Sequence, residues 1–513
     1  MSMNCKKNEM DLLNKFREDS KVFGTNPRQS RQLNLEVLGL ILAVLMNSLN
    51  PIQAAEKRPN ILFIMADDHT SQTWGCYGSR LAKFADTPNI DRLASEGALL
   101  KHCFCVNSIC VPSRASILTG QYSHLNGVRT LNDALDPKLD NVAKRMQAAG
   151  YQTSLIGKWH LKKAPSGFDY WNIIKGQGRY QQPILFEMNL DKPEVQKGKY
   201  CTDVFTDKAL NWLGTRQTNK PFFLMLHFKA THEPWQFHPR HAKLYQNIDL
   251  PEPETLFSST GPTNSRVPGW PLEILTERML GRNDHGDGKL ILKTDDPQSI
   301  RKATYQKFVK AFLRCGKAID ENIGRVLEYL DENNLANDTV VIYTSDQGYF
   351  LGEHNYFDKR FMLEESLRMP FVIRYPREIK AGTVLEDIIL NVDFAPTFLD
   401  YAGMKTPSSM QGKSARKNLL GNTAPDWRKS MYYRYFENSL ARPSHYGIRT
   451  HHHKLIYYDG IDSPSEAEKW EFYDLSKDPM ETRNMYDKED NQAIIRGLKL
   501  QLHRLQIQLK DSA

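Results

Sequence analysis

Cysteine is scarce in this chain, which has seven in 513 residues. A set that is odd in number and so sparse does not form the disulfide framework of a small secreted scaffold. Neither charge sign dominates, because 68 Lys and Arg against 60 Asp and Glu leave a formal net charge of +8. This surplus suits an anionic substrate but does not demand nucleic acid, so we expect no nucleic-acid partner. The chain also lacks internal repeats and low-complexity tracts, which excludes repeat architectures.

Long apolar runs are missing except for one. Residues Val37–Leu49 are uncharged and are followed by Asn50-Pro51 and the small pair Ala54-Ala55. The run is short for a membrane span and has the length of the hydrophobic region of a signal peptide. We predict that residues 1–56 are an N-terminal extension with a signal peptide and that the protein is exported, to the periplasm or outside the cell. No stable membrane span is expected after cleavage, whereas an uncleaved leader would anchor the chain.

The remaining composition is that of a folded chain, with 40% hydrophobic and 25% charged residues. After the leader, Asn60–Ala66 is a continuous apolar run of the kind buried in a parallel sheet. Similar runs recur at Gln152–Gly157, Phe222–Phe228 and Thr339–Thr344, separated by helical segments such as Thr304–Asn333. This alternation predicts an α/β fold in which a large, mostly parallel sheet is sandwiched by helices. We assign it to residues 57–420.

From about residue 421 the pattern changes to short strands followed by a terminal helix. Leu498, Leu502, Leu505 and Leu509 repeat at helical spacing and make one apolar face. We predict that residues 421–513 are a smaller C-terminal α+β domain with a short antiparallel sheet. Residues 237–299 are polar and rich in Pro and Gly, so we expect long loops there. Within them, residues 283–288 faintly resemble a calcium loop, although a solvated turn is the favoured interpretation.

Carboxylates follow two of the predicted strands. Asp67 and Asp68 end the first run, and Asp346 and Gln347 follow the run Thr339–Thr344. Parallel strands bring such ends together at the carboxyl edge of a sheet, where ligands usually bind. Ligands that are oxygen only suit calcium or magnesium and argue against zinc. The alternative is that each pair is an acidic turn facing water.

The most informative stretch begins at Cys110 and runs Cys-Val-Pro-Ser-Arg-Ala-Ser-Ile-Leu-Thr-Gly to Gly120. Its residue types place Cys110 at the N-terminus of a short helix, where the dipole favours negative charge, with Arg114 adding a fixed positive charge. A lone cysteine is otherwise most often a buried small hydrophobe. Three basic segments also follow strand-like runs, and they contain Lys158 and His160, His232, and Lys359. Cations and proton donors of this kind stabilise anionic esters during cleavage.

The Cys110 stretch matches the sulfatase signature C-x-P-S-R-x-x-x-L-T-G at every specified position. The chain therefore resembles the formylglycine-dependent sulfatases of the alkaline phosphatase superfamily. The resemblance covers the chain from about Arg58 to its end. It implies an alkaline phosphatase-like fold, and that a maturation enzyme converts Cys110 to formylglycine. It also implies a calcium ion, with magnesium as the alternative, held by Asp67, Asp68, Asp346, Gln347 and the group made from Cys110.

The resemblance further implies a role for each basic residue. Arg114 and Lys158 would hold the attacking hydroxyl of the formylglycine hydrate. His232 would protonate the departing sugar oxygen while Lys359 and Lys158 neutralise the sulfate. His160 would then take the proton of the second hydroxyl, so that sulfate leaves and the aldehyde re-forms. A serine could not complete this last step, because it has no second hydroxyl.

Two segments, Phe357–Arg368 and His445–Thr450, look most like bacterial polysaccharide sulfatases, including those that act on N-acetylglucosamine 6-sulfate. One departure is Leu363, where such relatives often have Tyr. On this basis His354, Arg360, His445 and Arg449 are candidates for holding the sugar, although ion pairs with Glu364, Glu365 or the C-terminal domain explain them as well. Trp235 is expected either to stack on a sugar ring or to fill the core.

We therefore expect a calcium-dependent sulfatase that removes sulfate from a carbohydrate. Phosphonate monoester and phosphodiester hydrolases share part of the signature, so an enzyme of that class on the same scaffold is the first alternative. The second is a protein that binds sulfated glycans without catalysis. Every inferred catalytic position is filled, which favours an enzyme.

Overall fold

The computed structural model describes residues 58–258 and 269–511. The chain from residue 58 onward forms one compact unit. The predicted signal peptide lies outside the described residues. Within those residues, none of the helices combines the length and the apolar character that crossing a bilayer requires.

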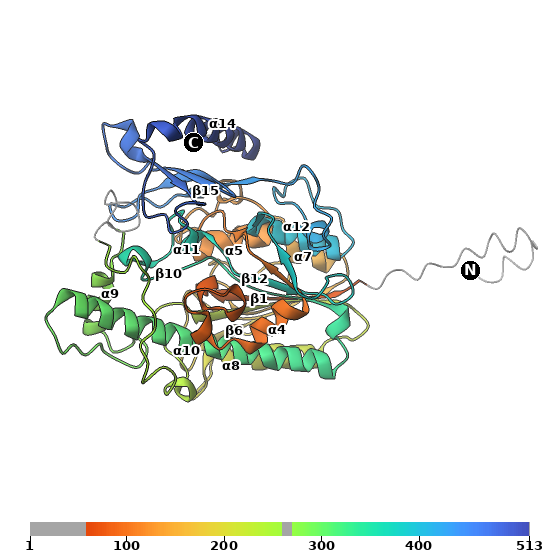
Figure 1. Ribbon diagram of the computed structural model, residues 1–513. Helices are drawn as coiled ribbons and strands as arrows, with labels where there is room; N and C mark the ends of the chain where they lie inside the picture. The colour runs from red at the N-terminus through yellow and green to blue at the C-terminus, as the bar shows by residue number, and fades with distance from the viewer. Residues whose placement is uncertain (1–57, 259–268, 512–513) are drawn as a thin grey trace, which may run out of the picture. The chain divides into compact units, whose positions relative to one another are not determined.

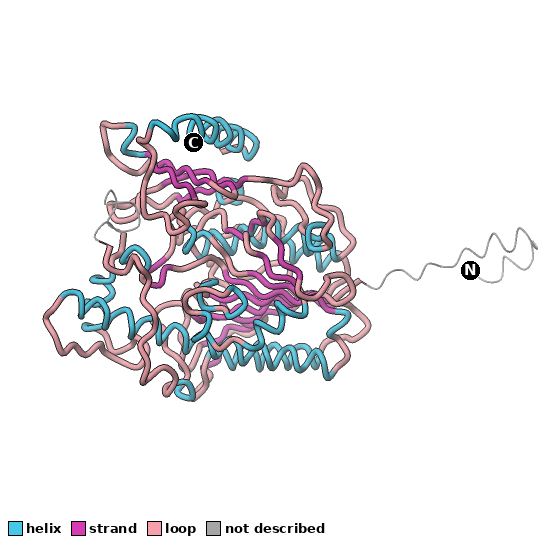
Figure 2. Tube along the Cα trace, in the orientation of Figure 1, coloured by secondary structure: helices cyan, strands magenta, loops and turns pink. Residues whose placement is uncertain are grey.

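A large sheet runs through the centre of this unit (Figures 1 and 2). Its ten described strands are ordered β13-β2-β12-β9-β1-β8-β4-β5-β6-β7. The central neighbours β9, β1, β8, β4 and β5 run parallel, whereas β12, β6 and β7 are antiparallel to their neighbours. The strands are β1 (Asn60–Asp67), β2 (Ala98–Leu100), β4 (Gln152–Lys158), β5 (Tyr170–Ile174), β6 (Ile184–Glu187), β7 (Glu194–Val195), β8 (Phe222–Thr231), β9 (Thr339–Ser345), β12 (Phe371–Arg374) and β13 (Thr383–Leu385).

Helices cover both faces of the sheet because its central strands are apolar on both faces. Along β1, Leu62 and Ile64 belong to one apolar cluster, and Phe63 and Met65 belong to another. The first cluster packs under α4, α8, α9 and α10, and the second under α5, α7 and α12. The helices are α3 (Ala82–Ala85), α4 (Pro88–Glu96), α5 (Cys110–Thr119), α6 (Ser123–Asn126), α7 (Val142–Ala148), α8 (Cys201–Thr215), α9 (Leu272–Gly281), α10 (Pro297–Glu332), α11 (Glu364–Leu367), α12 (Phe394–Tyr401), α13 (Arg416–Leu419) and α14 (Gln492–Leu509). The predicted α/β sandwich is confirmed.

The C-terminal segment forms a separate antiparallel sheet with α14 packed on it, as predicted. Leu498 and Leu502 are buried against this sheet, and Leu505 and Leu509 are half-buried on the same face. The sheet shares its apolar cluster with Ile109, just before α5. The division at residue 421 stays a prediction. The strands are β15 (Ser430–Tyr435), β16 (His445–Thr450), β17 (His453–Tyr457) and β18 (Trp470–Asp474), and the short pairs elsewhere are β3 (Cys103–Phe104) with β14 (Ile389–Leu390) and β10 (Phe350–Leu351) with β11 (Phe357–Asp358).

One expectation for the middle of the chain was wrong. The long loops expected over residues 237–299 are interrupted by α9, and α10 already begins at Pro297. Leu272, Leu275 and Met279 bury one side of α9, a helical spacing that the surrounding Pro and Gly obscured. Residues 283–288 form a turn in which Asp284 pairs with Arg282 at 2.7 Å, so this carboxylate is engaged with a cation of the chain.

Candidate active site

Four oxygen-bearing side chains meet where β1 and β9 end. Asp67 is the last residue of β1 and Asp68 follows it, while Asp346 and Gln347 follow β9. All four are buried, and oxygens of the three carboxylates lie within 4.8 Å of one another. The backbone N–H of Asp68 donates to Oδ1 of Asp346 at 3.1 Å, which joins the two loops. The predicted convergence of these residues is confirmed.

These side chains fit a hard divalent cation. Oε1 of Gln347 is buried and has no hydrogen-bond partner among the described residues. Its Nε2 donates to Oδ1 of Asp68 at 2.5 Å and lies 3.6 Å from Sγ of Cys110. Carboxylates this close repel one another when they are ionised, and a cation relieves that repulsion. A set of carboxylate and amide oxygens is the kind that calcium and magnesium prefer.

The three carboxyls differ in how readily they ionise. Burial alone would raise the pKa of Asp67, but the surrounding cations, Lys158 first among them, hold that pKa well below its ordinary value. Burial raises the pKa of Asp68 to about 6 and that of Asp346 to about 7, although nearby cations oppose the change. The carboxyl of Asp67 is therefore the one most firmly held as an anion.

Cys110 begins α5, which is capped after Thr119 by Gly120 in the left-handed conformation with φ 65°. The thiol is 1% exposed, and its Sγ lies 3.3 Å from Oδ1 of Asp67. Burial, followed by the charge of Asp67, raises the pKa of the thiol well above its ordinary value. The Cys110 side chain thus sits against the carboxylate cluster as a protonated thiol, which is a weak nucleophile.

Arg114 lies one turn further along α5 and ties the cluster together. Its Nε donates to Oδ2 of Asp346 at 2.9 Å, and one Nη donates to the carbonyl of Lys158 at 2.8 Å. The other Nη lies 3.5 Å from Oδ1 of Asp67. Because guanidinium is planar and stays charged, it fixes the ends of β1, β4 and β9 relative to α5.

Two buried lysines each face one carboxylate. Lys158, at the end of β4, pairs with Oδ2 of Asp67 and donates to Oε1 of Gln177 at 2.6 Å. Lys359 follows β11, and its Nζ lies 2.7 Å from Oδ2 of Asp68. Burial alone would lower the pKa of Lys359, but the Asp68 carboxylate raises it above the ordinary value. The ammonium group of Lys359 is therefore held in its charged form at the edge of the sheet.

The two histidines differ in orientation. Nδ1 of His232 lies 2.7 Å from the carbonyl of Glu233, so this nitrogen carries the proton in that contact. Its Nε2 faces the cluster, 3.8 Å from Oδ2 of Asp68. His160 lies past Lys158 with φ 63°, and its buried Nδ1 has no partner among the described residues. Burial, followed by the charge of Lys158, lowers the pKa of His160 to about 2.

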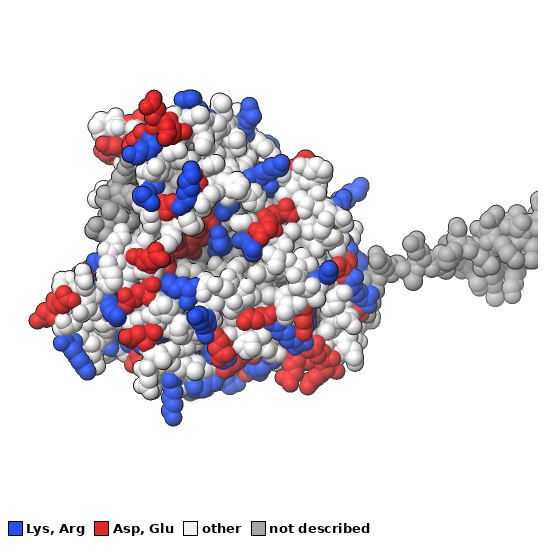
Figure 3. All heavy atoms as spheres, viewed as in Figure 1, with Lys and Arg blue, Asp and Glu red and all other residues white. Residues whose placement is uncertain are grey.

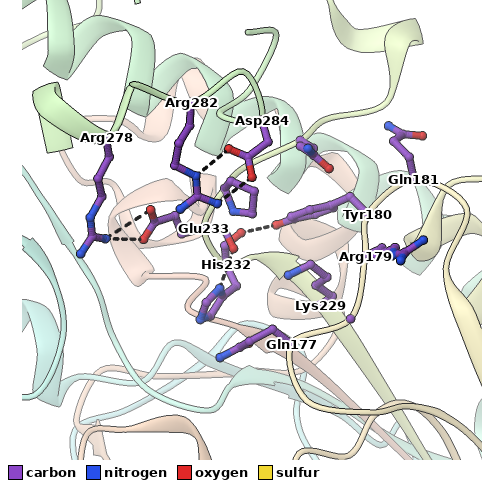
Figure 4. A pocket seen from close by; sticks show the side chains of 13 residues that line it. Gln177, Arg179, Tyr180, Gln181, Lys229, His232, Glu233, Arg278, Arg282 and Asp284 are labelled. Carbon is purple, nitrogen blue, oxygen red and sulfur yellow. Dashed lines mark hydrogen bonds and ion pairs between the residues drawn. The ribbon is translucent and has the colours of Figure 1, made fainter. Parts of the chain in front are cut away.

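A cavity of about 190 Å³ opens onto this group and is lined by Cys110, Asp68, His232 and Lys359. A larger cavity of about 700 Å³ adjoins it, since both are lined by Gln177, His232, Glu233 and Arg278 (Figure 4). Gln177, Glu233 and Arg278 were not singled out from the sequence. Only the turn signal of Gly176 and Gly178 around Gln177 pointed to a loop there.

Of the candidate sugar-binding residues, Arg360 lines the smaller cavity. Its guanidinium pairs with Asp358 at 2.7 Å and with Glu437 at 2.7 Å. His354 is buried beside the ring of Phe350 and lines neither cavity.

The other two candidates lie in the C-terminal sheet, away from both cavities. Arg449 pairs with Glu364 at 3.1 Å, which is the ion pair considered above as its alternative role. His445 is 1% exposed and packs among aromatic rings, including that of Phe361. Trp235 is fully buried, with its ring centroid 4.5 Å from that of Phe308, so it fills the core.

The fold and the site together define a class of protein. A mostly parallel sheet covered by helices carries, at the carboxyl edge of its strands, a buried oxygen cluster beside the buried Cys110 and several cations. This is the arrangement of a hydrolase of anionic esters on an alkaline phosphatase-like scaffold.

Comparison with known proteins gives the family. Residues 59–404 match the sulfatase family, and residues 352–508 match the C-terminal domain of N-sulphoglucosamine sulphohydrolase. The chain belongs to the sulfatase family and is a sulfuric ester hydrolase. It is 41% identical to an N-acetylglucosamine-6-O-sulfatase of Bacteroides thetaiotaomicron, over 93% of this chain and 91% of the relative. It is 27% identical to an arylsulfatase of Clostridium perfringens, over 84% and 91%.

Solved structures agree with this assignment. One, a complex of a protein with its substrate D-glucosamine-2-N,6-O-disulfate, matches with a TM-score of 0.81 and 40% identity, covering 89% of this chain and 99% of that one. A phosphonate monoester hydrolase of Agrobacterium radiobacter matches with a TM-score of 0.69 and 20% identity, over 88% and 96%. The second match shows a shared fold alone.

Proposed function

We propose that the protein removes 6-O-sulfate from glucosamine residues of a sulfated glycan and does so as an exported enzyme. The support for the sugar is the 41% identity to an N-acetylglucosamine-6-O-sulfatase across nearly the whole chain. The structural neighbour at 40% identity has a 6-O-sulfated glucosamine as its substrate. The cavity at Cys110 is lined by cations that suit a sulfate ester.

The nucleophile in this proposal is made from Cys110, which a maturation enzyme oxidises to formylglycine. The observation that carries the proposal is the position of its Sγ, buried at the head of α5 and 3.3 Å from Asp67 Oδ1. An unmodified thiol there is protonated and poorly nucleophilic, because burial raises its pKa. The hydrate of an aldehyde at the same position would present hydroxyl oxygens to the carboxylate cluster and to the cavity.

Asp67, Asp68, Asp346 and Gln347, together with the group made from Cys110, would hold calcium. The unpaired Oε1 of Gln347 and the mutual closeness of the carboxylates support this ligand set. A bound calcium ion supplies Lewis-acid polarisation of the hydrated nucleophile and neutralises negative charge. Magnesium is the alternative, because it also prefers oxygen ligands.

The side chains around the cavity would carry out the first half of the reaction. One hydroxyl oxygen of the hydrate would attack sulfur and give up its proton to the Asp67 carboxylate, while the bond between sulfur and the sugar oxygen breaks. Lys158 and Lys359 would neutralise the charge of the sulfate oxygens, while Arg114 would orient the nucleophile. His232 would act as the imidazolium: it donates the proton at Nε2 to the departing sugar oxygen and keeps the Nδ1 proton on the Glu233 carbonyl. Burial lowers the pKa of His232 well below its ordinary value, which makes this proton acidic, and the charge of the bound sulfate favours the protonated form.

The second half regenerates the aldehyde. His160 takes the proton of the remaining hydroxyl, the carbon–oxygen double bond re-forms and sulfate leaves. A histidine that is neutral before the reaction is needed for this step, and burial keeps the pKa of His160 low.

The test measures sulfate release by metal-loaded protein from its native host, using defined 6-sulfated glucosamine saccharides. We expect release by the parent protein and none by Cys110→Ala, with unchanged thermal unfolding. Cys76→Ala is the matched control, because this half-buried cysteine lies outside the site. Peptide mass analysis of active protein should find an aldehyde at position 110.

Four results would overturn the proposal. Activity retained in Cys110→Ala, or an unmodified thiol in fully active protein, would remove the nucleophile. A preference for aryl phosphonate over the matched aryl sulfate would favour a phosphonate hydrolase. Binding of sulfated glycans without sulfate release by correctly matured protein would instead favour a non-catalytic glycan-binding protein.

A further inference from the structure

The larger cavity beside the active site contains a buried cation that forms no salt bridge with a described residue, although the charge of Asp67 acts on it from a distance. Lys229, near the end of β8, is 2% exposed and lines this cavity. No described residue forms a salt bridge with its ammonium group, which lies 4.6 Å from the centroid of the Tyr180 ring. In Figure 4 the ammonium end of Lys229 is turned toward His232. A buried charge of this kind costs free energy unless an opposite charge approaches it.

The other charges of the cavity leave it positive. Its lining includes four basic residues other than histidine, and two acidic ones. Each acidic residue is already paired, Glu233 with Arg278 at 3.0 Å and Asp284 with Arg282 at 2.7 Å. Arg179 is exposed and, within the described part of the chain, forms no ion pair. Lys229 and Arg179 are therefore the cations of this cavity available to a ligand.

The position of the cavity connects these cations to the reaction. It shares His232 and Gln177 with the cavity at Cys110, and its volume of about 700 Å³ lies within the range of small-ligand pockets. Burial lowers the pKa of Lys229 to about 8, so the ammonium remains mostly protonated near neutral pH. A substrate bound through its scissile sulfate can extend from the smaller cavity past His232 into the larger one.

We propose that Lys229 and Arg179 form a binding site for a second anionic group, a sulfate or a carboxylate, carried by the same glycan as the scissile sulfate. This inference rests on the proposed function, because it takes the smaller cavity as the site of the scissile sulfate. It adds a substrate requirement: efficient turnover needs a second negative charge within reach of Lys229. The group lies either on the same sugar or on its neighbour.

Binding is measured first, with metal-loaded Cys110→Ala protein so that no ligand is consumed. The ligands are N-acetylglucosamine 6-sulfate, glucosamine-2-N,6-O-disulfate, and a disaccharide that joins a uronate to N-acetylglucosamine 6-sulfate, with its carboxyl-reduced form as reference. We expect at least one dianionic ligand to bind about tenfold or more tightly than its monoanionic reference, as a charge-assisted hydrogen bond allows. The preferred ligand distinguishes an anion on the same sugar from one on the next.

Variants then locate the effect. Lys229→Met in the Cys110→Ala protein should remove most of this preference, and Lys229→Arg should retain part of it. Arg179→Gln should reduce the preference without endangering the fold, since its side chain is exposed. Lys163→Met is the matched control, because this exposed lysine lines a different cavity. Thermal unfolding of each variant shows whether it is folded.

The possible results separate the two proposals. Equal binding of monoanionic and dianionic ligands would overturn the second-anion site, as would equal weakening of all ligands by Lys229→Met, which would place this lysine at the scissile sulfate. The second-anion site would also be overturned if both Arg179→Gln and a folded Lys229→Met kept the full preference for the dianionic ligand. Failure of the proposed function is recognised separately, by the absence of sulfate release from the same saccharides when mature parent protein is used.

Discussion

The proton donated by His232 should matter in proportion to the basicity of the leaving group. A sugar alkoxide must be protonated as it leaves, whereas a nitrophenolate departs as a stable anion. The contact of Nδ1 with the Glu233 carbonyl at 2.7 Å leaves Nε2 as the nitrogen that faces the site. The nearest alternative donor, Lys359, has a pKa that Asp68 raises, which makes it a poor acid.

The loss in His232→Ala should therefore approach the full contribution of a general acid. For a glucosamine 6-sulfate we expect kcat/KM to fall by about 10²–10⁴-fold, or about 3–5 kcal/mol of transition-state stabilisation. For 4-nitrophenyl sulfate the fall should stay within about tenfold, because only positioning and charge are lost.

Steady-state kinetics on both substrates, with the same metal-loaded preparation, measures the two losses. His452→Ala in the C-terminal segment is the matched control, since this exposed histidine lies outside both cavities. Equal losses on the two substrates would refute the role of His232 as the acid. They would leave it a residue that binds the sulfate group itself.

Three further outcomes are expected. Chelation of divalent metal should lower the midpoint of thermal unfolding, because an ion at about one hundred times its Kd contributes about 2.7 kcal/mol to the free energy of unfolding. An unchanged midpoint, together with activity in metal-free protein, would contradict the metal site. His445→Phe should reduce the loss of stability on acidification. Burial lowers the pKa of His445 to about 4, so as the pH falls the unfolded chain binds a proton at this residue before the native state does. The native state of the parent therefore loses about 2 kcal/mol of stability between about pH 8 and about pH 5. Denaturant unfolding at the two pH values measures this, and an equal loss in the free energy of unfolding for parent and variant would contradict it. Trp235→Ala should cost about 3–5 kcal/mol of stability through the cavity it leaves, and an effect on KM without a loss of stability would point to sugar stacking instead.

The features that the sequence predicted depend on local pattern. The run Asn60–Ala66 could be predicted as a buried central strand, because every position in it after Asn60 is apolar and can face a helix layer. The carboxylates that end it then had to meet those after Thr339–Thr344, since neighbouring parallel strands end at one edge. The resemblance carried by the Cys110 stretch placed the nucleophile, and the structure puts its sulfur in contact with that edge.

The features that the sequence did not predict depend on contacts between distant segments. Arg449 meets Glu364, 85 residues earlier, and nothing local distinguishes that ion pair from a sugar contact. Helix α9 is short and lies among Pro and Gly residues, so its apolar spacing was too brief to stand out. The isolation of Lys229 is also a tertiary property. It arises because the acidic residues of the same cavity form ion pairs with arginines, Glu233 with Arg278 and Asp284 with Arg282.

In the proposed function, recognition of a sulfated glycan would depend on a few buried cations and not on the net charge of the protein. On the face drawn in Figure 3, basic and acidic side chains are interspersed, so the formal charge of +8 does not gather into one basic patch there. Exposed charges are screened by salt within about 10 Å, whereas buried ones are screened much less. Lys158, Lys359 and Lys229 are each at most 3% exposed, and an anion that reaches them meets a strong local field. If the proposed second-anion site exists, the protein should select glycans by the separation of their anions, because a diffuse basic surface would instead bind according to total charge.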